Sequence, residues 1–269
     1  METKDIYKFS YNFLVKKAEG YVTKEQIDAF ISESDVQECN MASIYEILLN
    51  ILQDFNIYPN VIKFEQRKEK IKKIIHFPDL KYCASLDYIE LKNEFKRAFQ
   101  FKNEKCWLNY SKGVVSGAKF LAEFDTYEDF KNLCESFDEN VFTREAFALL
   151  LSTKISNMGF AIACNWLKEI GYKNYPKPDV HIKDICKAIG VLDEQGKDRD
   201  CFEQTIKIAE CCQSYRQCQL YRTFLLADLF HTCQDQWKID HRIQEEWMPD
   251  SSEQCVPTEY IAECSGQNS

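Results

Sequence analysis

Glycine and proline are scarce in this sequence of 269 residues, which contains 8 and 6 of them. An all-β sandwich or barrel needs a turn signal roughly every 8 to 12 residues, and these two residues supply many of those signals. No stretch of the sequence reads convincingly as a strand. The shortage of turn-forming residues therefore argues against an all-β fold.

Long apolar runs are also missing. No uninterrupted run approaches the roughly 18 residues that a membrane-spanning helix requires. The first 20 residues are charged throughout and do not follow the order of a secretory signal peptide. We therefore expect no membrane partner and a location in the cytoplasm, or in the nucleus of a eukaryote. In that setting the 13 cysteines would be reduced, and most would act as small buried hydrophobes.

Positive charge is in deficit, with 34 Lys and Arg against 43 Asp and Glu and a formal net charge of −9. Contacts to phosphate depend on Lys and Arg, so this balance is a caution against nucleic-acid binding. Net charge does not exclude a local basic surface, however. One basic run either lines a path for DNA or forms a solvated helix face, and it consists of Lys63, Arg67, Lys68, Lys70, Lys72 and Lys73.

Helix-forming segments are abundant. Apolar residues make up 45% of the sequence and recur at spacings of three and four residues in many places. We predict an all-α chain. The predicted helices lie within residues 1–60 and at 60–77, 86–101, 107–124 (which contains Gly113 and Gly117), 126–136 with a capping box at Thr126, from Thr143 onward with Thr143 as the N-cap, and within 201–237.

Domain organisation follows from where this periodicity stops. A polar segment follows Gly190, and apolar periodicity is weak beyond Pro249. We expect one helical domain over residues 1–248 and a loose carboxyl-terminal tail over residues 249–269.

The most informative pattern lies between residues 155 and 182. Ile155–Gly159 reads Ile-Ser-Asn-Met-Gly and places a glycine at the start of an apolar helix. Such a turn lets the backbone approach a phosphate, and the first amides of the helix favour an anion. After that helix, Pro176 and Pro178 stiffen a loop that presents Asp179 at the start of the next helix. A carboxylate fixed in this way can stabilise a developing positive charge and orient water.

This order of elements resembles the helix-hairpin-helix DNA glycosylase superfamily, which includes the adenine, alkylpurine and oxoguanine glycosylases. Their hairpin reads Leu-Pro-Gly-Val-Gly and their loop reads Val-Asp-Thr-His-Val or similar. Here the loop is Pro-Asp-Val-His-Ile (Pro178–Ile182). The number of residues between the hairpin glycine and the loop aspartate matches the family without a gap. The close resemblance covers residues 143–190. It implies a two-lobed helical bundle that binds double-stranded DNA, flips one nucleotide out and hydrolyses its N-glycosidic bond. We expect it to act as a monomer.

The resemblance assigns roles to single residues. Asp179 would be catalytic and would assist the departure of the base. Stacking against a flipped base could come from Trp107, Tyr110 and Phe120, although aromatic residues at helical spacing are also typical of a core. The contacts to DNA would come from Asn157, Met158, Gly159, Phe160, Ala161, His181 and Lys183.

Two of these residues have simpler interpretations. Aspartate is a favoured N-cap, so Asp179 could serve only to start the helix that follows it. His181 is more typical of a packed structural histidine than of an acid or base, because nothing nearby in the sequence orients it.

Three departures from the family pattern refine the prediction. Family members that also nick the strand carry a lysine two residues after the hairpin glycine, where Ala161 stands here, so we expect no lyase activity unless Lys154 or Lys168 supplies the amine. An arginine often found three residues after the loop histidine is replaced by Asp184. Many members hold a four-iron cluster, but no Cys-x-x-Cys occurs here, so we expect no iron-sulfur cluster, metal or other cofactor. The cysteines in the corresponding region are Cys201, Cys211, Cys212, Cys218 and Cys233.

Two alternatives to a glycosylase stay open at this stage. The same scaffold could alter a base rather than remove it, as in members of the superfamily associated with phage hypermodification of thymine. It could also be a DNA-binding or scaffolding module with no activity, because a fold does not determine a function.

Overall fold

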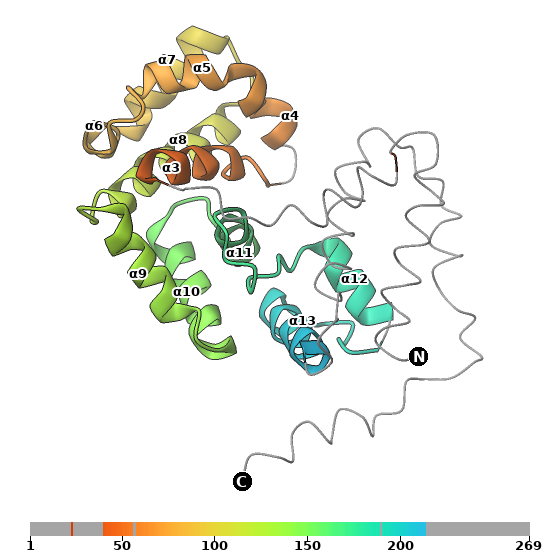
Figure 1. Ribbon diagram of the computed structural model, residues 1–269. Helices are drawn as coiled ribbons and strands as arrows, with labels where there is room; N and C mark the ends of the chain where they lie inside the picture. The colour runs from red at the N-terminus through yellow and green to blue at the C-terminus, as the bar shows by residue number, and fades with distance from the viewer. Residues whose placement is uncertain (1–22, 24–39, 56–57, 189, 214–269) are drawn as a thin grey trace. The chain divides into compact units, whose positions relative to one another are not determined.

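The computed structural model describes residue 23 and residues 40–55, 58–188 and 190–213 (Figure 1). These residues form helices and no strand, which confirms the prediction of an all-α chain. The chain divides into two compact units. We call Asp35–Lys177 the central unit, and Met1–Ser34 together with Pro178–Ser269 the terminal unit. The predicted tail at 249–269 lies outside the described residues.

The described helices of the central unit run from α3 to α11. Their bounds are α3 Met41–Ile51, α4 Tyr58–Ile62, α5 Phe64–Ile74, α6 Leu80–Ser85, α7 Tyr88–Phe99, α8 Glu104–Leu121, α9 Tyr127–Phe137, α10 Val141–Lys154 and α11 Phe160–Glu169. In the described part of the terminal unit, α12 Val180–Ala188 packs against α13 Asp198–Gln213.

Helix α8 forms the centre of the central unit. It packs against α3, α4, α6, α7 and α10. Buried tyrosines join it to α3, because the Tyr45 hydroxyl donates to the Val114 carbonyl (3.0 Å) and the Tyr110 hydroxyl donates to the Leu49 carbonyl (2.9 Å). Each bond satisfies a polar group that would be costly to bury alone. Helix α11 joins the same core through Trp166, whose Nε1 donates to the Ile44 carbonyl (3.3 Å).

The two glycines inside α8 allow neighbouring parts of the chain to approach closely. A Cβ at Gly117 would lie 2.5 Å from Cδ2 of Leu48 on α3. A Cβ at Gly113 would lie 2.9 Å from both Leu52 Cδ2 and the Ser156 carbonyl oxygen. The predicted helix is therefore confirmed, and the glycines in it are explained by packing against α3 and the 155–159 turn.

The predicted helix over residues 60–77 is broken at Lys63 and ends at Ile74 rather than at residue 77. Lys63 has a left-handed backbone (φ 53°) between α4 and α5. Polar side chains satisfy the groups that the break exposes. Gln53 Oε1 accepts from the Phe64 amide (3.0 Å), and Arg67 Nη1 donates to the Val61 and Ile62 carbonyls (2.8 and 3.0 Å).

Helix starts were predicted with mixed success. The capping box at Thr126 is confirmed, with Asp129 as its partner. Thr143 is not the N-cap of α10 as predicted. Asn140 is the N-cap, and Thr143 is the third helical residue, whose Oγ1 accepts from the Asn140 amide (3.1 Å). Asparagine outcompetes the later threonine because its short amide side chain reaches the amides of the first turn.

Candidate functional site

The turn between α10 and α11 is held firmly by the rest of the central unit. Helix α10 ends at Lys154, and α11 begins at Phe160 with Gly159 as its N-cap. Ser116 Oγ on α8 accepts from the Ser156 amide (2.8 Å). Asn157 has a left-handed backbone (φ 64°), a conformation that asparagine tolerates well, and its Nδ2 donates to the Leu52 carbonyl (3.2 Å). The side chain of Asn157 therefore serves the turn itself.

The start of α11 is open at Gly159. Gly159 is exposed, and a Cβ built on it meets nothing within 4 Å. It has no side chain to cap the helix, and helix amides not bonded within their own helix carry partial positive charge. Phe160 and Ala161 are half-buried in the first turn, whereas Met158 is buried and belongs to the core.

The open space at Gly159 makes Gly159→Ala an informative variant. Its φ of −79° suits alanine, so we expect the melting temperature to stay within about 2 °C of the wild type, since no clash arises. If a phosphate approaches this backbone, the added methyl group will obstruct it, and affinity for duplex DNA should fall roughly tenfold. Fluorescence anisotropy with a labelled duplex measures this. Unchanged affinity would remove Gly159 from the DNA contact.

Asp179 lies at the start of α12 and acts as its cap. Its Oδ1 accepts from the Ile182 amide (3.1 Å), and its carbonyl accepts from the Lys183 amide (3.0 Å). Asp179 thus stands at the start of the next helix, as predicted. It belongs to the terminal unit and the 155–159 turn to the central unit.

Two further predicted DNA contacts, Lys183 and His181, lie on α12, and the structure describes the side chain of only one of them. Lys183 Nζ forms an ion pair with Asp198 on α13 (2.7 Å), so its charge is shared within the terminal unit. His181 lies in α12, and its side chain is outside the described residues. Asp184, where the family often has arginine, is exposed.

The three aromatic residues predicted to wall a base pocket lie in the core. Trp107 and Tyr110 are fully buried, and Phe120 is 4% exposed. Trp107 stacks on Phe101 (ring centroids 4.8 Å apart). A flipped base could stack on these rings only if the core of the central unit opened.

The basic run at residues 63–73 is largely occupied by neighbouring groups. Lys68 and Lys72 both pair with Glu46 on α3. Lys70 Nζ donates to the Ala98 carbonyl (2.8 Å), and the Arg67 guanidinium lies over the Phe99 ring at 5.0 Å. These contacts tie α5 to α3 and α7, and they account for most of the run without DNA.

The described cysteines are buried thiols. Those with a described side chain are Cys83, Cys106, Cys134, Cys164, Cys186 and Cys201. Burial raises the pKa of Cys83 to about 11 and that of Cys134 to about 12, so both are thiols at neutral pH. Within the described ranges, no three His, Cys, Asp or Glu side chains gather as metal ligands, and no helix is long and apolar enough to cross a membrane.

Several polar residues of the central unit were missed by sequence reasoning. Asp138 bonds Arg144 and Asn174, and Asp54 bonds Asn165. Only Asn165 carried a signal, because it is a polar residue inside the buried run Ile162–Leu167.

Comparisons with protein-family models, with curated proteins and with solved structures found no match. The resemblance to the glycosylase superfamily therefore rests on the sequence between residues 143 and 190 alone.

Proposed function

We propose that this protein is a monofunctional DNA N-glycosylase that removes a damaged or modified base from double-stranded DNA. The observation that carries the proposal is the order of three local structures. Helices α10 and α11 are joined by a rigid turn that ends in an open glycine, and the loop after α11 ends in an aspartate at the start of α12. This is the arrangement that the resemblance implies for residues 155–182.

The grip on DNA is assigned to the backbone at the start of α11. The amides of Phe160 and Ala161 follow the exposed Gly159, which has no side chain of its own to obstruct a phosphate. A contact of this kind is independent of base sequence and sets the register of the protein on the duplex. It also requires little net positive charge, which suits a chain with a formal charge of −9.

The chemistry is assigned to the carboxylate of Asp179. As the bond from C1′ to the base nitrogen breaks, its electron pair leaves with the base and the sugar becomes positively charged. A fixed carboxylate stabilises that charge. Water then bonds through its oxygen to C1′ and gives one proton to the carboxylate. The departing base takes up one proton from solvent, and the carboxylate returns its proton to solvent, so that the enzyme is regenerated. The products are a free base and an abasic site.

Strand cleavage by an amine is not part of the proposal. Ala161 stands where the nicking members of the superfamily carry lysine. Lys168 lies eight residues beyond Phe160, about 12 Å further along α11, because a helix rises about 1.5 Å per residue. Lys154 lies at the end of α10 and pairs with Glu123 (3.8 Å). The abasic product should therefore persist on an intact strand.

A panel of duplexes carrying different modified bases tests the proposal. We expect strand breaks in one or more duplexes only after hot alkali, which cleaves at abasic sites. Breaks without alkali would indicate lyase activity. If every duplex survives alkali, the glycosylase proposal fails. Mass spectrometry of the recovered nucleosides would then separate an enzyme that alters a base from a protein that only binds DNA.

A DNA-binding module without activity is the second candidate, and one observation favours it. The bond from the Ile182 amide to Asp179 accounts for an aspartate at this position as a helix cap. In that case, duplex binding would depend on the 155–159 turn and no base would be released.

A further inference from the structure

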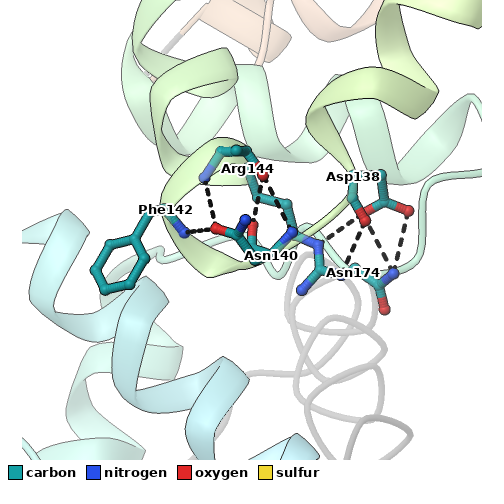
Figure 2. A network of polar contacts seen from close by, with 6 residues as sticks. Asp138, Asn140, Phe142, Arg144 and Asn174 are labelled. Carbon is teal, nitrogen blue, oxygen red and sulfur yellow. Dashed lines mark hydrogen bonds and ion pairs between the residues drawn. The ribbon is translucent and has the colours of Figure 1, made fainter.

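The segment Tyr172–Lys177 leads from α11 to Asp179. The carboxylate of Asp138 attaches the middle of this segment to the rest of the central unit. Asn174 Nδ2 lies 3.2 Å from Oδ1 and 3.1 Å from Oδ2 of Asp138 (Figure 2). The same carboxylate accepts from Arg144 Nε on α10 (2.7 Å), and Arg144 Nη2 donates to the Asp138 carbonyl (3.0 Å). Asp138 therefore joins the segment to the helix that precedes the 155–159 turn.

A second carboxylate attaches the end of the segment in the same way. Asp54, just beyond α3, accepts at Oδ2 from Asn165 Nδ2 on α11 (3.0 Å). Lys177 Nζ lies 3.6 Å from that same oxygen. Asn165 is 6% exposed, so its amide is bonded in a largely dry environment, where such bonds are strong. Asp54 therefore joins the segment to the helix that follows the turn.

Two aromatic residues also anchor the segment. Tyr175 is fully buried, and burial raises the pKa of its hydroxyl above the usual range. The Tyr172 hydroxyl donates to the Lys131 carbonyl on α9 (3.5 Å). The segment is thus held along its length, and it ends two residues before Asp179.

We propose that Asp54 and Asp138 are positioning residues, each of which holds one helix beside the 155–159 turn and one residue of the segment that leads to Asp179. Asp138 does so through hydrogen bonds from Arg144 and Asn174. Asp54 does so through a hydrogen bond from Asn165 and an ion pair with Lys177. Together they fix the end of the central unit, from which the chain continues to Asp179.

Hydrogen bonds that involve a charged group suit this task because they are stronger than neutral ones. Arg144 forms two bonds to Asp138, one to its carboxylate and one to its carbonyl. The consequence for catalysis rests on the proposed glycosylase function, whereas the holding of the segment does not.

Substitutions within the segment itself test the proposal and leave the bonds to α10 and α11 in place. Asn174→Ala leaves the bond between Asp138 and Arg144, and Lys177→Met leaves the bond between Asp54 and Asn165. We expect amide hydrogen exchange within residues 172–177 to become roughly tenfold faster in each variant and faster still in the double variant. In single-turnover assays the double variant should excise the base roughly tenfold more slowly, with unchanged affinity for the duplex.

Matched controls make the same chemical changes elsewhere on the central unit. Asn93→Ala on α7 and Lys119→Met on α8 alter exposed residues, and both should leave exchange in the segment and excision unchanged. Lys119→Met also controls for the loss of one positive charge from the protein.

Hydrogen exchange and base excision together separate the positioning proposal from the glycosylase proposal. Unchanged exchange in the double variant would overturn the positioning role, whatever the activity. Faster exchange with unimpaired excision would also overturn it, because the held segment would not matter for catalysis. If the wild-type protein excises no base from any duplex, faster exchange would still support the two carboxylate attachments, and only the glycosylase proposal would fail.

Discussion

Asp179→Asn is expected to slow base excision roughly 100- to 1,000-fold, the usual cost of removing one group that stabilises charge in a transition state. Stability should hardly change. Asparagine is as good an N-cap as aspartate, so its side-chain oxygen can still accept from the Ile182 amide that bonds Asp179 Oδ1 at 3.1 Å. The variant therefore removes the negative charge and keeps the local structure.

The measurement combines single-turnover excision, duplex affinity and thermal unfolding. Asp179→Ala is the useful companion, because it loses both the charge and the cap. It should be as inactive as Asp179→Asn and also less stable, by about 1 kcal/mol. A drop in stability in the alanine variant alone would separate the capping role from the chemical role.

Asp87→Asn provides a control of the same kind. Asp87 is the N-cap of α7, where its Oδ1 accepts from the Ile89 and Glu90 amides (2.8 and 3.0 Å). The same substitution at a cap in the central unit should leave excision unchanged. Full activity in Asp179→Asn would show that Asp179 is a cap and that another group performs any catalysis.

The features that the sequence predicts well are those determined by neighbouring residues. The capping box at Thr126 needs only Asp129, three residues away. Gly159 at the start of α11 and Asp179 at the start of α12 are likewise signalled within a few positions. Scarce turn residues and helical periodicity were sufficient for the all-α class.

The features that the sequence does not predict depend on distant partners. The break at Lys63 is stabilised in part by Gln53, whose side chain bonds the Phe64 amide from the end of α3. Apolar spacing alone gives no sign of this bond, so residues 60–77 looked like one helix. The aromatic spacing of α8 was equally ambiguous, and Trp107 and Tyr110 proved to be core residues once α3 and α7 packed around them.

The candidate site likewise combines features set by neighbouring residues with features that depend on distant ones. The turn and the aspartate form a local pattern, but the bonds that hold the chain between them join residues far apart in the sequence. Asn165 and Asp54 are 111 residues apart in the sequence, and Asn174 and Asp138 are 36 apart. A single sequence offers no means of pairing residues at such separations, whereas the folded core brings each pair within hydrogen-bonding distance.

Gly117→Ala should destabilise the protein by about 1 to 3 kcal/mol, the usual cost of adding a carbon to a well-packed core. In an isolated helix the change would have the opposite sign, because alanine is favoured over glycine by about 1 kcal/mol. Here the steric cost exceeds the gain in helix propensity, because the new Cβ would lie 2.5 Å from Leu48 Cδ2, closer than carbon atoms can approach. Leu48 is fully buried on α3 and cannot turn away into solvent.

Urea unfolding of a double-mutant cycle identifies the cause. Leu48→Ala removes the atom that the new Cβ would strike, at the cost of a cavity. If the clash explains the loss, Gly117→Ala should cost much less in the Leu48→Ala background than in the wild type, and the two changes will not add. Equal costs in both backgrounds would mean that Leu48 is not the obstacle. Gly159→Ala should be nearly neutral in the same assay, because that glycine faces open space, and the contrast separates a glycine required by packing from one open to a ligand.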